Sequence, residues 1–336
     1  MRWRLKRLLV GATLLALGAG GAVWWFMRDM QHALDQPLPV AQPELYEVSA
    51  GQTITRIAKV FVAKGWLTHA IYLRLEASRR GIAARVQSGT YEVTPGITPR
   101  RLLEKFVRGA VKQYQFTIIE GITFRELRAQ IATLPGVDAT LQGLDDGAAM
   151  RRIEAIDQLP EGRFFPSTYY YLHHTPDTEL LARAYQEMQR VLDAAWQKRA
   201  AELPYSASYE ALIMASIIEK ETGRADERRA IAGVFVRRLQ QGMKLQTDPT
   251  VIYGLGAAFD GNLRRGDLRR DSPFNTYLRP GLPPTPIAMP GAAAIEAALN
   301  PAPGTALYFV ARGDGSHEFS ATLAAHQRAV RQFQLK

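Results

Sequence analysis

The pattern of hydrophobic and polar positions changes three times along this chain of 336 residues. Residues 8–27 are apolar and uncharged, residues 28–44 are polar and rich in proline, and the rest alternates at helical or strand spacing. A helix of about 20 residues, at about 1.5 Å per residue, spans the hydrocarbon of a bilayer. The first segment therefore predicts a membrane-spanning helix, and the last predicts folded domains.

The flanks of the apolar run predict its orientation. Residues 2–7 contain four basic side chains and no acid, and residues 24–26 are all aromatic. Basic residues stay on the cytoplasmic side, and amphipathic rings favour the membrane interface. We therefore expect residues 1–30 to be a cytoplasmic stub and an anchor, with everything after them outside. A cleaved signal peptide is the alternative, because the small residues at 18–22 offer a cleavage site.

The segment after the anchor predicts a tether and then a small unit. Residues 31–44 hold three prolines and few large apolar side chains, which is typical of an extended linker. The unit spans 45–112 and is interpreted as a recognition module. Its predicted elements are a strand at 46–48, helices at 54–64 and 68–80, a strand at 89–93, and a helix that begins at Thr98 and ends at Gly109.

Residues 113–336 predict a larger, mixed α+β domain. Its predicted elements are strands at 114–119 and 306–310, and helices at 123–134, 178–203, 209–222, 226–241 and from 322. Residues 135–150 read as a loop. Residues 273–304 contain eight prolines, which predicts an irregular stretch that winds over a surface and is typical of a functional segment.

Composition narrows the chemistry. The chain has no cysteine, which excludes disulfides, cysteine-based metal sites and cysteine nucleophiles. Its net charge is +10, from 42 basic and 32 acidic residues. Because four of the basic residues precede the anchor, the rest carries 38 minus 32, or +6. This excess fits an anionic partner, but no motif interleaves aromatic and basic residues, so we expect no nucleic acid.

The helix at 209–222 carries the first candidate for catalysis. It is almost entirely apolar up to Glu219, and a partly desolvated carboxyl has the raised pKa that a general acid needs. Glu221 lies about 200° away around the helix, so the two carboxyls do not point into one cleft. A solvated helix end with an ordinary Glu-Lys-Glu face is the alternative.

Two other segments favour carbohydrate binding. Glu161 adjoins a glycine and several aromatic residues, as in platforms that stack on sugars, although a turn before a core strand explains the same pattern. Residues 245–253, together with 275–277, offer many partners for sugar hydroxyls and acetamides. The candidate binding residues here are Gln246, Asp248, Thr250, Tyr253, Asn275, Thr276 and Tyr277.

Other chemistries have little support in the sequence. His173 and His174 adjoin each other, and neighbouring side chains rarely chelate one metal. The chain has no phosphate-binding loop, no dinucleotide fingerprint and no nucleophile elbow. We therefore expect no metal and no cofactor.

Longer motifs resemble one family. Residues 215–222 (ASIIEKET), 245–254 (LQTDPTVIYG), 275–277 (NTY) and 281–284 (GLPP) are closely similar to the MltG (YceG-like) family of endolytic murein transglycosylases. The resemblance covers about residues 44–336, with the same order of segments. In one departure, Ser167 stands where the family commonly has Asp, which puts an acidic role at that position in doubt.

The resemblance implies a fold and a reaction. The unit at 45–112 would be a LysM-like peptidoglycan-recognition subdomain, and residues 113–336 the catalytic domain. Glu219 would protonate the leaving glucosamine oxygen and then deprotonate the muramyl C6 hydroxyl, which closes on C1 as a 1,6-anhydro ring. No second carboxylate is required, because the nucleophile is intramolecular. Glu161 and the binding residues named above would line the glycan cleft.

The implied setting is the periplasmic face of a bacterial inner membrane. The substrate would be nascent peptidoglycan glycan strands, whose polymerisation the cleavage ends, and penicillin-binding peptidoglycan synthases would be partners. The alternative function is a non-catalytic, membrane-anchored scaffold that binds peptidoglycan and positions these synthases.

Overall fold

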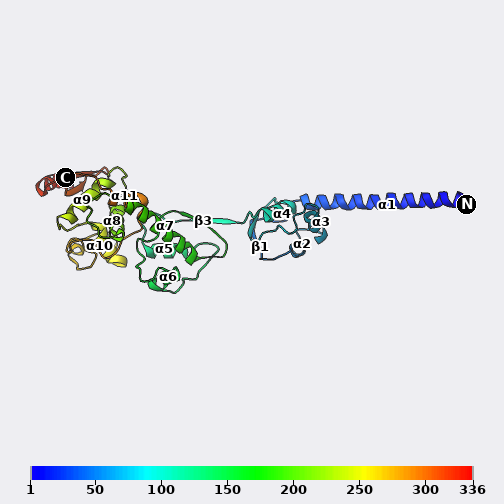
Figure 1. The fold of residues 1–336 in the computed structure, drawn as a ribbon, viewed down its shortest axis with the longest axis horizontal. Helices are drawn as coiled ribbons and strands as arrows, with labels where there is room; N and C mark the ends of the chain where they lie inside the picture. The colour runs from blue at the N-terminus through cyan, green and yellow to red at the C-terminus, as the bar shows by residue number, and fades with distance from the viewer. Residues whose placement is uncertain (1, 335–336) are drawn as a thin grey trace. The chain divides into compact units, whose positions relative to one another are not determined.

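A computed structural model describes residues 2–334, which divide into two compact units between Tyr114 and Gln115 (Figure 1). The N-terminal unit contains the long helix α1 and a small α+β part, which runs from Glu44 to Arg108 and which we call the head. The C-terminal unit is mixed α+β. Each of the four sheets formed by the described residues has two strands. The α+β class expected from the sequence is confirmed.

The N-terminal unit has the predicted order of elements. These are α1 (Arg2–Asp35), β1 (Glu44–Val48), α2 (Ile54–Ala63), α3 (Ala70–Arg79), β2 (Gly89–Val93) and α4 (Pro99–Arg108). Strands β1 and β2 are antiparallel, with Tyr46 opposite Tyr91. The Thr98 side chain caps α4, and Gly109 ends it with a left-handed φ of 65°, as the sequence predicted.

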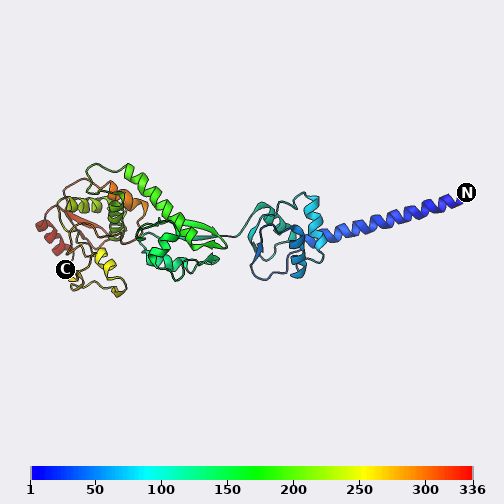
Figure 2. The same cartoon turned by 60° about the horizontal axis from the view of Figure 1, so that its bottom comes forward.

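The predicted tether is not extended over its first part. Helix α1 continues to Asp35 without a break, as both views show (Figures 1 and 2). Met30, Leu34 and Leu38 are buried in the core of the head, and the backbone N–H of Leu38 donates to the carbonyl of Ile97. Burial of Met30 and Leu34 favours the continued helix. The prediction of an extended linker rested on the prolines at 37, 39 and 43 and missed the burial of these side chains.

The core of the head is aromatic. Tyr46 and Phe106 stack with their ring centroids 5.6 Å apart, and Phe61 packs edge-on against Tyr46 and Trp66. These residues come from β1, α2, α4 and the turn after α2. Tyr91 of β2 and Leu73 of α3 belong to the same core, so both strands and the three helices of the head pack around one cluster.

The C-terminal unit has many short elements. They are β3 (Gln113–Thr117, which begins at the boundary), α5 (Phe124–Ile131), β4 (Val137–Asp138), α6 (Asp146–Arg152), β5 (Thr168–Leu172), β6 (Thr175–Pro176), α7 (Asp177–Gln197), α8 (Ser208–Glu221), α9 (Arg228–Gln240), α10 (Asp248–Leu255), the 3-10 turns η1 (Gly256–Ala258) and η2 (Asp267–Arg269), α11 (Ala292–Leu299), β7 (Tyr308–Ala311), β8 (His317–Ser320) and α12 (Leu323–Phe333). β3 pairs with β5, β4 runs parallel to β6, and β7 is antiparallel to β8.

Helix α8 is the centre of this unit. All eight residues from Ala211 to Ile218 are buried, and α7, α9, α10 and α11 pack around the helix. A helix that is apolar on every face must be covered on every face. Its first turn, from Ser208 to Glu210, and its last turn, from Glu219 to Glu221, reach exposed or partly exposed positions, so the carboxyls of the last turn lie beyond the buried stretch.

Two segments differ from the sequence prediction. Residues 135–150, read as a loop, contain β4 and the start of α6. Residues 273–304, read as winding over a surface, contain the buried helix α11, in which Ala294, Ile295 and Leu299 are fully covered. The prolines at 290 and 301 lie outside this helix, and its alanine-rich sequence has a high helix propensity.

Candidate functional site

The two carboxyls in the last turn of α8, Glu219 and Glu221, have different hydrogen-bond partners. Oε2 of Glu219 accepts the backbone N–H of Gly291, at the N-terminus of α11, at 2.9 Å. Oε2 of Glu221 accepts the hydroxyl of Thr247 at 2.6 Å. Glu221 lines a cavity of about 500 Å³, which we call the Glu221 cavity. The divergence expected from the helical spacing is therefore observed.

Glu219 lies between the backbone N–H of Gly291 and the carboxylate of Glu120. Burial raises its pKa, the Gly291 N–H lowers it, and the neighbouring carboxylate of Glu120 raises it. A Cβ at position 291 would come within 1.7 Å of Oε1 of Glu120, so a larger residue there would have to displace the Glu120 side chain. Glu219 is absent from the lining of the Glu221 cavity and of the second cavity described below.

Glu221 faces a polar cavity. Burial raises its pKa, and the Thr247 hydrogen bond and the charges of His317 and Arg238 lower it. Among the described residues, Thr247 is the one hydrogen-bond donor to this carboxyl, and it contacts one of the two oxygens. Glu221 therefore has the raised pKa of a general acid and a second oxygen available to a ligand.

Three of the predicted binding residues join Glu221 in this cavity. Gln246, Asp248 and Tyr277 line it, and the hydroxyl of Tyr277 donates to Oδ1 of Asp248 at 2.6 Å. Gln246 has a left-handed φ of 51°, which is unusual for a residue other than glycine. Strain of this kind persists where surrounding contacts hold it, and it is common at ligand sites.

Three other predicted residues hold the cavity wall from behind. Thr250, Asn275 and Thr276 are almost fully buried and are absent from the lining. The hydroxyls of Thr250 and Thr276 lie 2.9 Å apart, and that of Thr276 accepts the backbone N–H of Thr247 at 3.1 Å. Asn275 donates to the carbonyls of Leu268 and Arg270. These residues position the 246–248 segment, and the expectation that they contact substrate is not supported.

Glu161 and Tyr253 belong to a second cavity of about 910 Å³, which we call the Glu161 cavity. Oε2 of Glu161 accepts the Tyr253 hydroxyl at 3.0 Å, and Oε1 accepts the backbone N–H of Phe124, the first residue of α5, at 3.0 Å. Burial raises the pKa of Glu161 to about 7. Much of the wall is apolar, including Phe124, Phe274 and Ile287.

The sequence analysis attached no role to Arg238 and His317, which line the Glu221 cavity, or to Glu227 beside His317. The guanidinium of Arg238, on α9, is buried and donates to the carbonyls of Leu307 and Leu245 at 2.7 and 2.6 Å. Nδ1 of His317, on β8, lies 2.6 Å from Oε2 of Glu227, whose other oxygen accepts the His317 backbone N–H. Arg238 and His317 line the Glu221 cavity. They come from distant elements, so no local motif could have grouped them.

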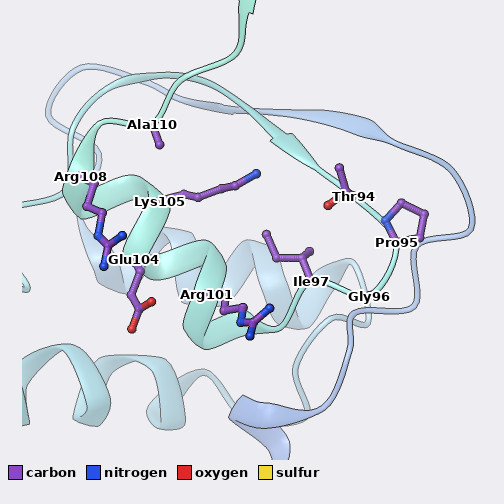
Figure 3. A pocket seen from close by; sticks show the side chains of 9 residues that line it. All are labelled: Thr94, Pro95, Gly96, Ile97, Arg101, Glu104, Lys105, Arg108 and Ala110. Carbon is purple, nitrogen blue, oxygen red and sulfur yellow. The ribbon is translucent and has the colours of Figure 1, made fainter.

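The head contains a third, basic pocket of about 460 Å³ (Figure 3). Arg101, Lys105 and Arg108 come from α4 at helical spacing, and the loop after β2 forms the opposite wall. Arg101 and Arg108 are exposed, and no carboxylate of the described residues lies within 4.0 Å of either. Among residues 2–334, no cluster of three His, Cys, Asp or Glu side chains could hold a metal ion.

Comparison with known proteins identifies the family. The family model described as YceG-like matches residues 46–332. The chain belongs to the YceG-like family. It is 30% identical over 305 residues to the endolytic murein transglycosylase of Bacillus subtilis (strain 168), covering 85% of this chain and 83% of the relative. The resemblance read from the sequence motifs is confirmed.

Two further relatives agree. The endolytic murein transglycosylase of Streptococcus pneumoniae (strain D39) is 26% identical over 342 residues, which cover 89% of this chain and 59% of that protein. The crystal structure of a yceG-like protein from Listeria monocytogenes matches with a TM-score of 0.53 and 28% identity, covering 85% of this chain and 99% of that one.

Proposed function

We propose that this YceG-like protein is an endolytic murein transglycosylase whose general acid and base is Glu221. The observation that carries the assignment is the Glu221 cavity, where a carboxyl with a raised pKa lies among Gln246, Asp248 and Tyr277. The two curated relatives described above are endolytic murein transglycosylases. The polar wall supplies the partners that sugar hydroxyls and acetamides need.

The geometry favours Glu221 over Glu219, the residue that the sequence favoured. The carboxylate of Glu219 binds the N-terminus of α11 and contacts neither the polar wall nor its residues. A carboxylate at a helix N-terminus is stabilised by the exposed N–H groups and dipole, which is a structural role. The reaction is unchanged by this reassignment, because it requires one carboxyl with a raised pKa, and Glu221 supplies it.

Glu161 is a weaker candidate, because both of its oxygens are occupied. Each accepts a hydrogen bond within the protein, from Tyr253 and from the start of α5. To act as an acid it would have to exchange one of these for a bond to substrate. We assign Glu161 to the wall of an adjoining site, where it holds Tyr253 in place.

The proposed reaction needs one carboxyl. Protonated Glu221 gives its proton to the glycosidic oxygen as the bond from that oxygen to C1 of N-acetylmuramic acid breaks. The resulting carboxylate takes the proton of the muramyl C6 hydroxyl as its oxygen bonds to C1. The products are a free glucosamine 4-hydroxyl and a 1,6-anhydromuramyl end, and Glu221 returns to its protonated form without consuming water.

The decisive experiment compares two variants of the full chain in detergent. Purified peptidoglycan strands are digested, and the products are separated and weighed by mass spectrometry. We expect anhydromuramyl ends with the native chain and with Glu219→Gln, and none with Glu221→Gln. Loss of product with Glu219→Gln but not with Glu221→Gln would return the role to Glu219. Reducing ends in place of anhydro ends would show a hydrolase.

The remaining setting is also proposed. Helix α1 has a stretch, Lys6–Asp35, that is long and apolar enough to cross a membrane. Together with the basic residues before it, this supports a single-pass protein of the bacterial inner membrane with a cytoplasmic N-terminus and a periplasmic catalytic unit. Penicillin-binding synthases, which make the nascent strands, are the proposed partners.

The head is proposed to bind the wall through its basic pocket. Carboxylates of peptidoglycan stem peptides match the charge of Arg101, Lys105 and Arg108. The strand–helix–helix–strand order supports a LysM-like fold. We expect the double variant Arg101→Gln, Arg108→Gln to bind isolated cell walls more weakly, whereas Arg85→Gln, which alters an exposed arginine outside the pocket, binds normally. Equal binding by the native chain and both variants would exclude a role for the pocket in wall binding.

A further inference from the structure

The apolar helix and the head form one continuous body. Trp24 and Trp25 are more than 60% exposed, whereas Met30 and Leu34, further along α1, are at most 1% exposed and lie in the core of the head. The same helix therefore passes from the apolar run into the folded head with no linker between them.

Contacts with α3 and α4 hold α1 in the head. The Phe26 ring packs edge-on against Tyr72 of α3, with centroids 5.5 Å apart, and the Tyr72 hydroxyl donates to Asp29. Arg100 of α4 bonds Asp35 of α1 at 2.7 Å and also contacts the fully buried Glu76 of α3. An Asp–Arg–Glu network of this kind gives the junction a defined geometry.

These contacts place α3 at the level where the uncharged run ends. Phe26 lies one residue before the end of that run, and its ring touches α3 directly. Figure 1 shows α3 at the end of the head from which α1 emerges. Because a helix rises about 1.5 Å per residue, a head held this close to the run cannot move far from a membrane that the run spans.

The outer side of α3 has the composition of a membrane-surface helix. Ile71 and Leu75, one turn apart, are 38% and 39% exposed, and the exposed Arg74 lies between them in sequence. Apolar side chains beside a basic one suit the boundary between acyl chains and phosphate headgroups.

We propose that α3 lies in the headgroup layer of the membrane, with Ile71 and Leu75 among the acyl-chain ends and Arg74 on lipid phosphates. This inference rests on the proposed anchoring by α1. The head would then be fixed in height and tilt, and the start of the wall-binding unit would be set at the membrane surface, where strands are newly made.

The absence of cysteine from the chain allows a direct test. The variants Ile71→Cys and Leu75→Cys are each spin-labelled in the full chain and reconstituted in vesicles of phosphatidylethanolamine and phosphatidylglycerol. Leu45→Cys is the matched control, because Leu45 is 42% exposed on β1. We expect labels at 71 and 75 to collide more with oxygen and less with a water-soluble nickel chelate than the label at 45.

The outcomes distinguish a failure of this inference from a failure of the proposed anchoring by α1. Flotation of the vesicles first reports whether the chain is anchored at all, and failure to float overturns the anchor. If the chain floats but all three labels are equally accessible to the nickel chelate, the head stands clear of the lipid and the inference is wrong. The labels need no enzymatic activity, so an inactive protein gives the same answer.

Discussion

The Glu161 and Glu221 cavities differ in what their carboxyls contact, although burial raises the pKa of both residues. Glu161 accepts one hydrogen bond at each oxygen, and much of its cavity wall is apolar. Glu221 has one oxygen free of protein donors, and its wall is polar. Burial favours the protonated form of both carboxyls, and we propose that an oxygen without a donor among the described residues and a polar wall make the Glu221 proton available to a glycan.

The largest expected effect is the loss of kcat when Glu221, the proposed catalytic carboxyl, is replaced. Glu221→Gln removes the transferable proton but keeps the size of the side chain and an acceptor for Thr247. General acid–base catalysis contributes about 10²–10⁴-fold, so we expect kcat to fall by about 10³-fold with KM little changed. Turnover of purified glycan strands measures both constants. An unchanged kcat would remove Glu221 from the reaction.

The second effect concerns the stability of the unit around Glu161. Its pKa of about 7 in the folded chain lies above its ordinary value of 4.5, so the folded state binds more protons between these values. Stability is therefore full below about pH 4.5 and decreases as the pH rises to 7, by up to about 3 kcal/mol. We expect urea unfolding to show this decrease, and Glu161→Gln to make it smaller. An equal slope in both proteins would contradict the assignment.

The third effect tests the polar wall. Tyr277→Phe removes the hydroxyl that donates to Asp248 but keeps the ring. A hydrogen bond to a charged group contributes about 1.5–3 kcal/mol. Because Tyr277 lines the wall and does not transfer the proton, we expect only part of this free energy to be lost from transition-state binding. We expect kcat/KM to fall by about 10-fold. Tyr253→Phe, in the other cavity, is the matched control and should lower it less.

The smallest effect is expected at Glu219. Glu219→Gln keeps an oxygen that accepts the Gly291 N–H, so the start of α11 stays bonded. We expect activity within about threefold of native, because the loss is confined to the charge at a helix N-terminus, which is worth about 0.3–1 kcal/mol. A thermal melt read beside the activity assay checks both points. A loss of activity as large as that of Glu221→Gln would show that both carboxyls are needed for the reaction.

Local signals in the sequence were enough for most of the fold. The cap at Thr98, the capping box of Thr123 and Glu126, and the long apolar pattern of α8 each depend on neighbours within a few residues, and each is observed. The helical spacing that separates Glu219 from Glu221 is local too. The start of the head was misread, since Met30, Leu34 and Leu38 are buried by residues far along the chain.

The candidate site was predictable only in part. Gln246, Asp248 and Tyr277 were grouped correctly, because two nearby motifs carry them. Thr250, Asn275 and Thr276 belong to the same motifs but are turned inward, a distinction that depends on burial. Arg238 and His317 join the site from α9 and β8, which no spacing along the chain connects.

The sequence by itself determined the family, the apolar helix, the order of the elements and the turn of α8 that we propose carries the catalytic carboxyl. Only the tertiary structure decided which carboxyl of that turn faces a polar cavity, because α11 covers Glu219 while the 246–248 segment and β8 surround Glu221. The physical reason is that the pKa and accessibility of a carboxyl depend on desolvation and donors supplied by distant segments.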